Sequence, residues 1–282
     1  RMLRGIRWDL TKEHIIWVNG YRVTTIPNDE GISSELLEFR IHEPLTTRVL
    51  QEELSRGMWC LDIGANIGYF TLLESMKVGA EGKVIAIEPS PINSSYLKRN
   101  IQLNGFRNID TSHFAMSDID AEANFLLSPK SNWCRIVDDT ALLPKGKIIR
   151  VPVRRLDSFA EEQALPRLDL ITMDVEGHEI RVCRGAKNVL RKFKPSILME
   201  VHVHYLGLEN TIGLLQELRK DGYDVKYFMP RELDWPLVGL KEDIIRMSID
   251  RLLTMLAERK LADCFHVSVS YTHLRAHETG RN

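Results

Sequence analysis

Two segments of the chain combine glycines and single carboxylates with short apolar runs. In the first, an apolar run leads into Gly64, Asn66 and Gly68, and in the second a similar run ends on Glu88. Glycines let the backbone turn closely beneath a ligand, and a carboxylate at a strand end can accept hydrogen bonds from both hydroxyls of a ribose. The pattern therefore predicts a nucleotide-binding strand–helix–strand unit.

Asp62, two residues before the first glycine, selects among nucleotide ligands. A dinucleotide fingerprint has the spacing Gly-x-Gly-x-x-Gly and places a pyrophosphate at the helix N-terminus. A carboxylate at Asp62 would repel a pyrophosphate and attract an ammonium group. S-adenosylmethionine carries a ribose, an adenine, an ammonium and a sulfonium, and no phosphate. The charges therefore favour this cofactor, and an NAD-dependent oxidoreductase is the least favoured alternative.

A second group of titratable residues follows two later apolar runs that are predicted to be strands. Asp174, Glu176 and His178 come after the first run, and His202 comes after the second. Methyl transfer to a hydroxyl needs in-line geometry and usually a base, and these four residues are the candidates, with Asp174 as the first choice. The alternative is a helix-capping role, because acids such as Glu176 and Glu179 are favoured at a helix N-terminus.

A metal site is a further alternative for this region. Asp174 and Glu200 end adjacent predicted strands, with His202 and His204 nearby in the sequence. Carboxylate and imidazole ligands could hold Mg²⁺ or a transition metal. Histidines near strand ends are more often packed or solvated, so no metal is included in the predicted site.

The remaining predicted cofactor contacts follow the second and third strands. Ser90 and Asn93 come just after the ribose carboxylate and could touch the adenosine edge. Ser117 and Asp118 close the third strand, where adenine would be held, although Asp118 could equally be an ordinary turn residue.

Alternating strands and helices should position all of these residues. Strands are predicted at 59–63, 83–88, 109–116, 168–174, 196–201 and 224–229, with helices at 67–78, 91–104, 178–193, 208–221 and 241–262 and a last strand from Phe265. Residues 118–158 break the rhythm and are predicted to form an inserted hairpin or loop at the carboxyl edge of the sheet, where ligands bind in open α/β folds.

The chain ends differ from this pattern. An Asn-Gly turn predicts a hairpin at residues 14–26, and residues 33–55 read as a helix interrupted near Pro44. From Ser270 onward the sequence fits no element and resembles non-native read-through. The predicted division is a cover at 1–55, a main domain at 56–267 and a non-native tail at 268–282.

Composition narrows the class of protein. The 282 residues are 44% hydrophobic and carry a formal net charge of −1, which suits one large α/β domain and argues against a general nucleic-acid binder. The four cysteines form no C-x-x-C pair, as expected of free thiols in the cytoplasm. No apolar run approaches the roughly 18 residues of a membrane span. The chain begins at Arg1 rather than methionine, which indicates a fragment.

Several blocks of the sequence resemble the FkbM family of S-adenosylmethionine-dependent methyltransferases. The matching blocks are residues 62–71, 88–91, 156–157, 174–179 and 195–200. The stretch Asp-Val-Glu-Gly-His-Glu at 174–179 is the most distinctive, and His178 departs from it where a small residue is more usual.

The resemblance implies a class I methyltransferase fold, which is an α/β fold with a mostly parallel seven-stranded sheet flanked by helices. It implies that Asp62 and Gly64 frame the methionine moiety, that Asn66 and Gly68 shape the turn, and that Glu88 binds the ribose. It also implies methylation of a hydroxyl on a glycan, a glycan precursor or a small natural product. The rivals are an RNA or protein methyltransferase of the same fold and a catalytically silent binding module, which the carboxylates argue against.

Overall fold

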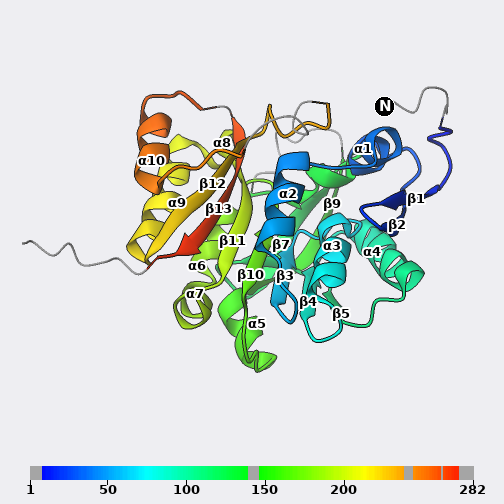
Figure 1. The fold of residues 1–282 in the computed structure, drawn as a ribbon, viewed down its shortest axis with the longest axis horizontal. Coiled ribbons are helices and arrows are strands. Elements are labelled where there is room, and N and C mark those ends of the chain that lie inside the picture. Colours follow the sequence, from blue (N-terminus) through cyan, green and yellow to red (C-terminus); the bar gives the residue numbers. More distant parts are fainter. Residues whose placement is uncertain (1–7, 139–145, 238–243, 262, 273–282) are drawn as a thin grey trace, which may run out of the picture.

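A seven-stranded sheet forms the centre of the computed structural model, which describes residues 8–138, 146–237, 244–261 and 263–272 (Figure 1). Its strand order is β12-β13-β11-β10-β3-β4-β5. The strands are β3 (Trp59–Ile63), β4 (Lys83–Ile87), β5 (Ile109–Ser112), β10 (Leu170–Met173), β11 (Ser196–His202), β12 (Tyr223–Pro230) and β13 (Cys264–Tyr271). Neighbours pair in parallel except at β13, which runs antiparallel to β11 and β12. The predicted α/β class is confirmed.

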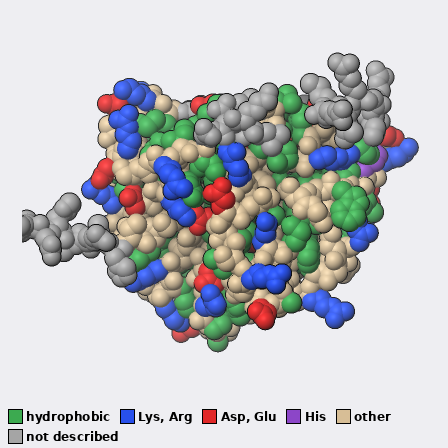
Figure 2. Space-filling model, in the orientation of Figure 1, with side chains coloured by type: hydrophobic (Ala, Val, Ile, Leu, Met, Phe, Trp, Pro, Cys, Tyr) green, Lys and Arg blue, Asp and Glu red, His purple; other side chains and the backbone are tan. Residues whose placement is uncertain are grey.

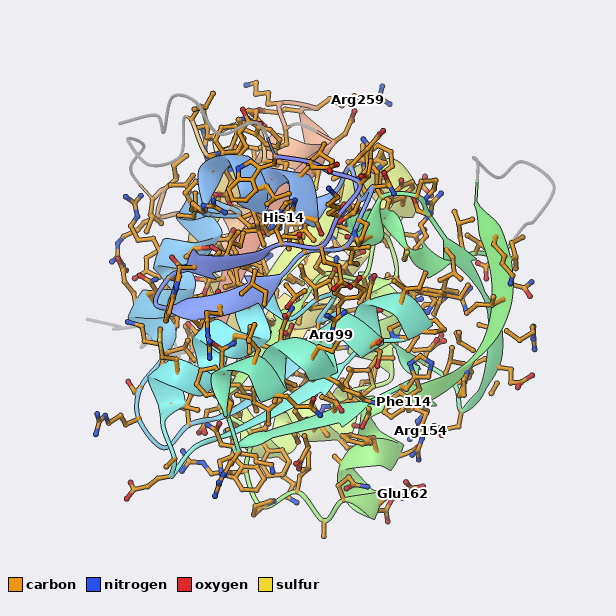
Figure 3. The ribbon with its side chains drawn as sticks, turned by 90° about the vertical axis from the view of Figure 1, so that its right-hand side faces the viewer. His14, Arg99, Phe114, Arg154, Glu162 and Arg259 are labelled. Carbon is orange, nitrogen blue, oxygen red and sulfur yellow. The ribbon has the colours of Figure 1, made fainter. Side chains whose placement is uncertain are left out.

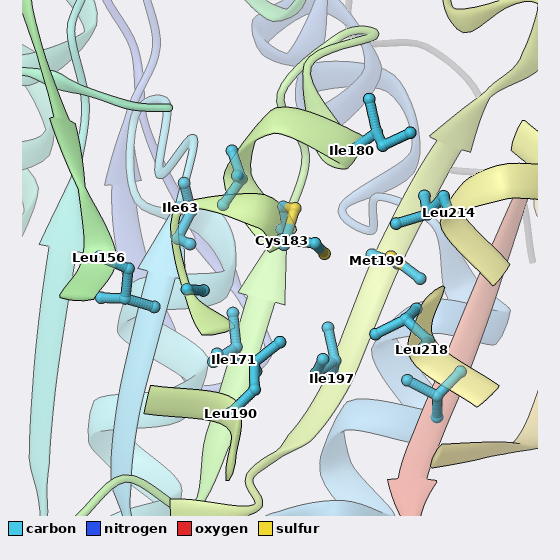
Figure 4. Packing of buried hydrophobic residues seen from close by; sticks show 14 of the residues in the cluster. Ile63, Leu156, Ile171, Ile180, Cys183, Leu190, Ile197, Met199, Leu214 and Leu218 are labelled. Carbon is cyan, nitrogen blue, oxygen red and sulfur yellow. The ribbon is translucent and has the colours of Figure 1, made fainter. Parts of the chain in front are cut away.

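Helices cover both faces of this sheet because its strands are apolar on both sides. In β3, Cys60 packs into one hydrophobic layer and the next residue, Leu61, packs into the other. One layer contains α5 (Leu156–Glu162), α6 (Glu179–Arg184), α7 (Lys187–Phe193), α9 (Leu208–Lys220) and α10 (Ile249–Ala257). Figure 4 shows this layer, with Ile171 and Ile197 of the strands beside Leu190 and Leu218 of the helices.

The other layer contains the predicted N-terminal cover. The cover consists of the hairpin β1 (Ile15–Val18) and β2 (Tyr21–Thr24) and the helices α1 (Ile32–Phe39) and α2 (Pro44–Glu53). Helix α3 (Tyr69–Val78) belongs to the same layer. Helix α4 (Pro91–Asn104) packs Leu97 against Ala86 of β4. The hairpin and the helix interruption before Pro44 are both confirmed.

The predicted insertion at 118–158 is a second sheet with the order β6-β9-β7-β8. Its strands are β6 (Ala115–Ser117), β7 (Ala121–Leu127), β8 (Arg135–Ile136) and β9 (Lys147–Arg155), and the short helix η1 (Ser131–Trp133) precedes β8. Arg154 of β9 pairs with Glu162 of α5 at 2.6 Å and stacks over Phe114 (Figure 3). These contacts fasten the second sheet to the helical layer.

Three predicted elements are wrong in their bounds. The strand at 109–116 is two strands, because β5 ends at Ser112 and β6 pairs with β9 instead. The helix at 178–193 is two helices that are separated at Gly185. The helix at 241–262 is shorter within the described residues, since α10 begins at Ile249 behind the Ser248 cap, while Ile245 bridges Phe228 as extended chain.

The last strand is longer than predicted. Strand β13 runs to Tyr271 and lies between β11 and β12, so the boundary placed at 268 falls inside a strand. Residues 273–282 of the predicted tail lie outside the described residues. The face in Figure 2 intersperses basic, acidic and apolar side chains. Within the described ranges, no helix has both the length and the apolarity that a bilayer span requires.

Candidate functional site

Two cavities open near the carboxyl ends of the central strands and share part of their walls. Cavity A lies between β4 and the second sheet and measures about 530 Å³, including space that is open to solvent. Cavity B lies beneath α1 and α2 and measures about 560 Å³ on the same basis. Both are lined by Gly64, Asn66, Asn132 and Asp174.

Cavity A is lined by the carboxylate of Glu88 and by apolar side chains. The Glu88 oxygens accept hydrogen bonds from the backbone N–H groups of Asn66 and Ser90, both at 2.7 Å. Burial raises the pKa of Glu88 to about 7, although the two N–H groups lower it. Met116 and Phe125 contribute apolar surface. This combination fits a nucleoside, with its ribose hydroxyls on the carboxylate.

Gly64 lets the loop after β3 lie against the end of β10. Its φ angle is +87°, and a Cβ at this position would lie 1.9 Å from the backbone oxygen of Asp174. A side chain here would therefore force the shared wall of the two cavities apart.

We expect Gly64→Ala to destabilise the fold by more than about 2 kcal/mol and to abolish cofactor binding, because strain at φ and the backbone clash add together. Urea unfolding and a cofactor titration check this. The matched control is Gly57→Ala, whose φ is +81° and whose Cβ would meet nothing within 4 Å. Equal losses in the two variants would show that the φ strain alone is responsible.

Asp62 lines cavity B rather than cavity A, and it is the outermost of a buried acidic group. Its oxygens contact the hydroxyls of Thr71 at 2.5 Å and Thr172 at 3.2 Å, and Thr172 also contacts Glu74 at 2.7 Å. Burial raises the pKa of Asp62 to about 6 and that of Glu74 well above its usual value. Glu74 was not predicted, because its helical position gives no sign that it is buried.

The other predicted cofactor residues divide into two groups. Asn93 lines cavity A and donates to the backbone oxygen of Ser131 at 3.0 Å. Gly68, Ser90, Ser117 and Asp118 are not among the residues that line either cavity. Gly68 starts α3 and Ser90 caps α4.

Ser117 and Asp118 do not line the cavities, although Ala115 and Met116 of the same strand, β6, line cavity A. The Ser117 hydroxyl contacts the Nε2 atom of His178 at 2.9 Å, and Asp118 lies 3.7 Å from Arg181. His178 does line cavity A, and burial lowers its pKa to about 4, so its imidazole is neutral. Its neutral ring can donate to or accept from a ligand.

Three predicted catalytic residues converge at the ends of β10 and β11. The Nε2 atom of His202 lies 3.3 Å from Glu176 and 3.9 Å from Asp174, and its Nδ1 atom lies 2.7 Å from Glu179. Burial raises the pKa of Asp174, and the neighbouring carboxylates of Glu200 and Glu176 raise it further. Asp174 is the member that reaches both cavities. His202 is not among the residues that line either cavity.

A second group of acidic and basic residues lies at cavity B, and only its member Glu200 was named from the sequence, as a possible metal ligand. Glu43 lies 3.0 Å from His266 and 3.3 Å from His42, and Glu200 lies 3.3 Å from Arg231. Glu43 has a φ of +43°, an uncommon conformation for a residue with a side chain. Such strain is concentrated at functional sites.

Asp29 joins the N-terminal cover to the second sheet across the cavities. Its carboxylate accepts hydrogen bonds from the backbone and the hydroxyl of Ser131 at 2.9 and 2.8 Å, and from the backbone of Gly31 and Ser33 at 2.9 and 3.0 Å. The adjacent Asn132 lines both cavities. Asp29 therefore fixes one wall of the site.

We expect Asp29→Ala to lower the free energy of unfolding by about 2–3 kcal/mol and to speed cofactor release. The reason is that the backbone N–H groups of Gly31 and Ser33 and the two donors of Ser131 lose their shared carboxylate acceptor. Thermal unfolding and stopped-flow dissociation measure the two effects. Asp9→Ala is the control, since Asp9 is exposed and, among the described residues, its carboxylate contacts Thr11 and Lys12. Unchanged release from Asp29→Ala would contradict the assignment.

Comparison with known proteins places this geometry in a family. A model of the methyltransferase FkbM domain matches residues 62–225. "Methyltransferase 1" of Beauveria bassiana is 30% identical over 142 residues, which cover 44% of this chain and 57% of that protein. The hexuronic acid methyltransferase AglP of Haloferax volcanii is 24% identical over 155 residues, covering 55% and 60%. The matches thus span less than two thirds of these relatives.

Among solved structures, the methyltransferase FkbM of Methylobacillus flagellatus aligns with a TM-score of 0.42 and 18% identity, covering 76% of this chain and 44% of that one.

Proposed function

This chain belongs to the FkbM family of methyltransferases, and on that premise we propose that it transfers the methyl group of S-adenosylmethionine to a hydroxyl of a glycan, a glycan precursor or a small natural product. The observation that carries the proposal is the shared wall of cavities A and B. In-line transfer needs donor and acceptor on opposite sides of one point. Asp174 and Gly64 line both cavities and would therefore lie beside the methyl group during transfer.

The residues of cavity A fit the cofactor. Glu88 would accept the ribose hydroxyls, and Met116 and Phe125 would contact the adenine. Asp62 lies toward cavity B, where it would attract the ammonium group. The Oδ1 atom of Asn66, which lies between the two cavities, is buried and has no hydrogen-bond partner among the described residues. Such an atom is satisfied when a ligand donor reaches it.

When bound, S-adenosylmethionine supplies an electrophilic methyl group, and the protein has to position and deprotonate the acceptor. Asp174 faces cavity B and carries a carboxylate with a raised pKa, so it is suited to take a hydroxyl proton or to hold the acceptor. Phe70 and Tyr69 line the same cavity and offer aromatic surface to an acceptor ring. The free thiols of buried Cys60 and Cys183 support a reducing, cytoplasmic location.

Calorimetric titration with S-adenosylmethionine, S-adenosylhomocysteine and NAD tests the cofactor. We expect the first two to bind and NAD not to bind. A screen with radiolabelled methyl donor, starting from neutral sugars, then tests the acceptor class. A folded protein that binds neither sulfur compound would contradict the proposed function and leave a silent binding module as the explanation.

A further inference from the structure

His202 faces three carboxylates at the wall between the two cavities. Its Nε2 atom lies 3.3 Å from Glu176, 3.5 Å from Glu200 and 3.9 Å from Asp174. These separations are longer than the usual N–H···O hydrogen bond of about 2.7–3.2 Å. Ligand atoms bound to one small cation at about 2.1 Å lie about 3.0–3.5 Å apart. The separations from Glu176 and Glu200 fall within this range, and Asp174 lies slightly farther away.

Glu179 holds His202 in the orientation that a metal ligand needs. The Nδ1 atom of His202 contacts Glu179 at 2.7 Å, and the same carboxylate oxygen accepts the backbone N–H of Gly177 at 3.0 Å. A histidine that donates one ring nitrogen to a carboxylate presents the lone pair of the other nitrogen to a metal. Only 4% of the His202 side chain is exposed, so its Nε2 atom is committed to this group.

One atom of the group lacks a hydrogen bond. The Oδ1 atom of Asp174 is buried, although 34% of the side chain is exposed, and it lies 3.9 Å from the Nε2 atom of His202 with no hydrogen-bond partner among the described residues. Glu176 has a φ of +50°, a left-handed conformation that turns the chain at the end of β10. Strain of this kind, of order 1–3 kcal/mol, persists where the surroundings impose it, as they do at binding sites.

We propose that Asp174, Glu176 and His202, whose ligand atoms lie within 4.8 Å of one another, bind one divalent transition-metal ion. The imidazole nitrogen favours a transition metal over Mg²⁺ or Ca²⁺, which prefer oxygen alone. Glu179 orients His202 without binding the ion. The use of the ion rests on the proposed function, since at this wall it would hold the acceptor hydroxyl beside Asp174 and make it more acidic.

Neighbouring groups of the same residue types are already paired. Glu43 and His266 form a direct contact of 3.0 Å. Asp234 accepts from the backbone of Leu45 and from the backbone and hydroxyl of Thr46. Glu43, Asp234 and His266 also offer ligand atoms within 4.8 Å of one another, so variants of the His202 group are needed to assign the bound ion.

The test is a titration of chelator-treated, dialysed protein with Mn²⁺, following the electron paramagnetic resonance signal of the free ion. We expect one ion per chain in the wild type. Glu176→Gln and Asp174→Asn should each weaken binding at least tenfold, and Glu179→Gln should weaken it about 10- to 100-fold. The matched control is His204→Ala, because His204 is exposed and only two residues from His202. It should bind Mn²⁺ like the wild type.

Thermal unfolding provides a second readout that does not depend on a variant's resting stability. Mn²⁺ should raise the Tm of the wild type and of His204→Ala, but not that of Glu176→Gln. No binding by the wild type, or equal binding by Glu176→Gln and His204→Ala, would overturn the inference. S-adenosylmethionine binding to the metal-free protein is measured separately, so a failure of the proposed function is recognised independently.

Discussion

Replacing Glu88 by glutamine is expected to weaken S-adenosylmethionine binding about 100-fold and to stabilise the ligand-free protein at pH 8. The affinity falls because an amide oxygen replaces a carboxylate that would accept two charge-assisted hydrogen bonds from the ribose, each contributing about 1.5–3 kcal/mol. Titration calorimetry measures this loss. Glu81→Gln, which removes an exposed carboxylate near the start of β4, should bind like the wild type.

The gain in stability follows from the pKa of Glu88, which burial raises from its ordinary value of 4.5 to about 7. A raised pKa means that the folded state holds the proton more tightly than the unfolded chain. The stabilisation is therefore complete below pH 4.5 and is lost as the pH rises through 7. At pH 8 the wild type buries a charge, which lowers its free energy of unfolding by at most about 3 kcal/mol. Glutamine buries no charge.

Urea unfolding at pH 5 and pH 8 separates these contributions. The stability of Glu88→Gln relative to wild type should be higher by about 1–2 kcal/mol at pH 8, since one of the two backbone donors loses its acceptor and offsets part of the gain. The difference should shrink or reverse at pH 5. A difference that does not depend on pH would contradict the assigned pKa.

The same carboxyl group should make cofactor binding depend on pH. The ribose requires the ionised form, so affinity should fall by up to about tenfold per pH unit below pH 7. Between pH 6 and pH 7 this slope should disappear in Glu88→Gln, whereas below pH 6 protonation of Asp62 also weakens binding. An affinity that is constant between pH 5 and pH 8 would show that Glu88 is not the ribose ligand.

The first half of the site could be predicted because its residues are local in sequence. Asp62, Gly64 and Glu88 belong to one strand–helix–strand unit, whose apolar periods and glycines are visible without knowledge of the rest of the chain. The structure places Gly64 and Glu88 together on cavity A, and their role in binding the cofactor stays a prediction. Asp62 faces cavity B, because alternate residues of a strand point to opposite sides of the sheet.

The second half could not be predicted, because it depends on which strands become neighbours. His266 reaches Glu43 and Glu200 only because β13 lies between β11 and β12, and the sequence around His266 shows no motif. The prediction of the third strand, at 109–116, was wrong for a similar reason. An apolar period continues from Ile109 to Met116, but pairing with β9 moves the last three residues to another sheet.

Asp174→Asn is expected to lower the rate of methyl transfer about 10²- to 10⁴-fold while changing the affinity for S-adenosylmethionine by only a few-fold. Asparagine keeps the size of the side chain and the Gly64 contact, which is made by the backbone of Asp174. What it removes is the carboxylate at the shared wall. The loss should therefore fall on the acceptor half of the reaction.

The split between kcat and KM identifies the role of Asp174. If it takes the proton, kcat should fall and KM for the acceptor should stay the same, whereas a residue that holds the acceptor should raise KM. Asp250→Asn on α10, where the side chain is exposed and pairs with Arg219, is the matched control and should transfer methyl groups at the wild-type rate. A wild-type rate in Asp174→Asn would remove this carboxylate from the chemistry. Methyl transfer would then have to use an acceptor hydroxyl that is acidic enough to lose its proton without a base.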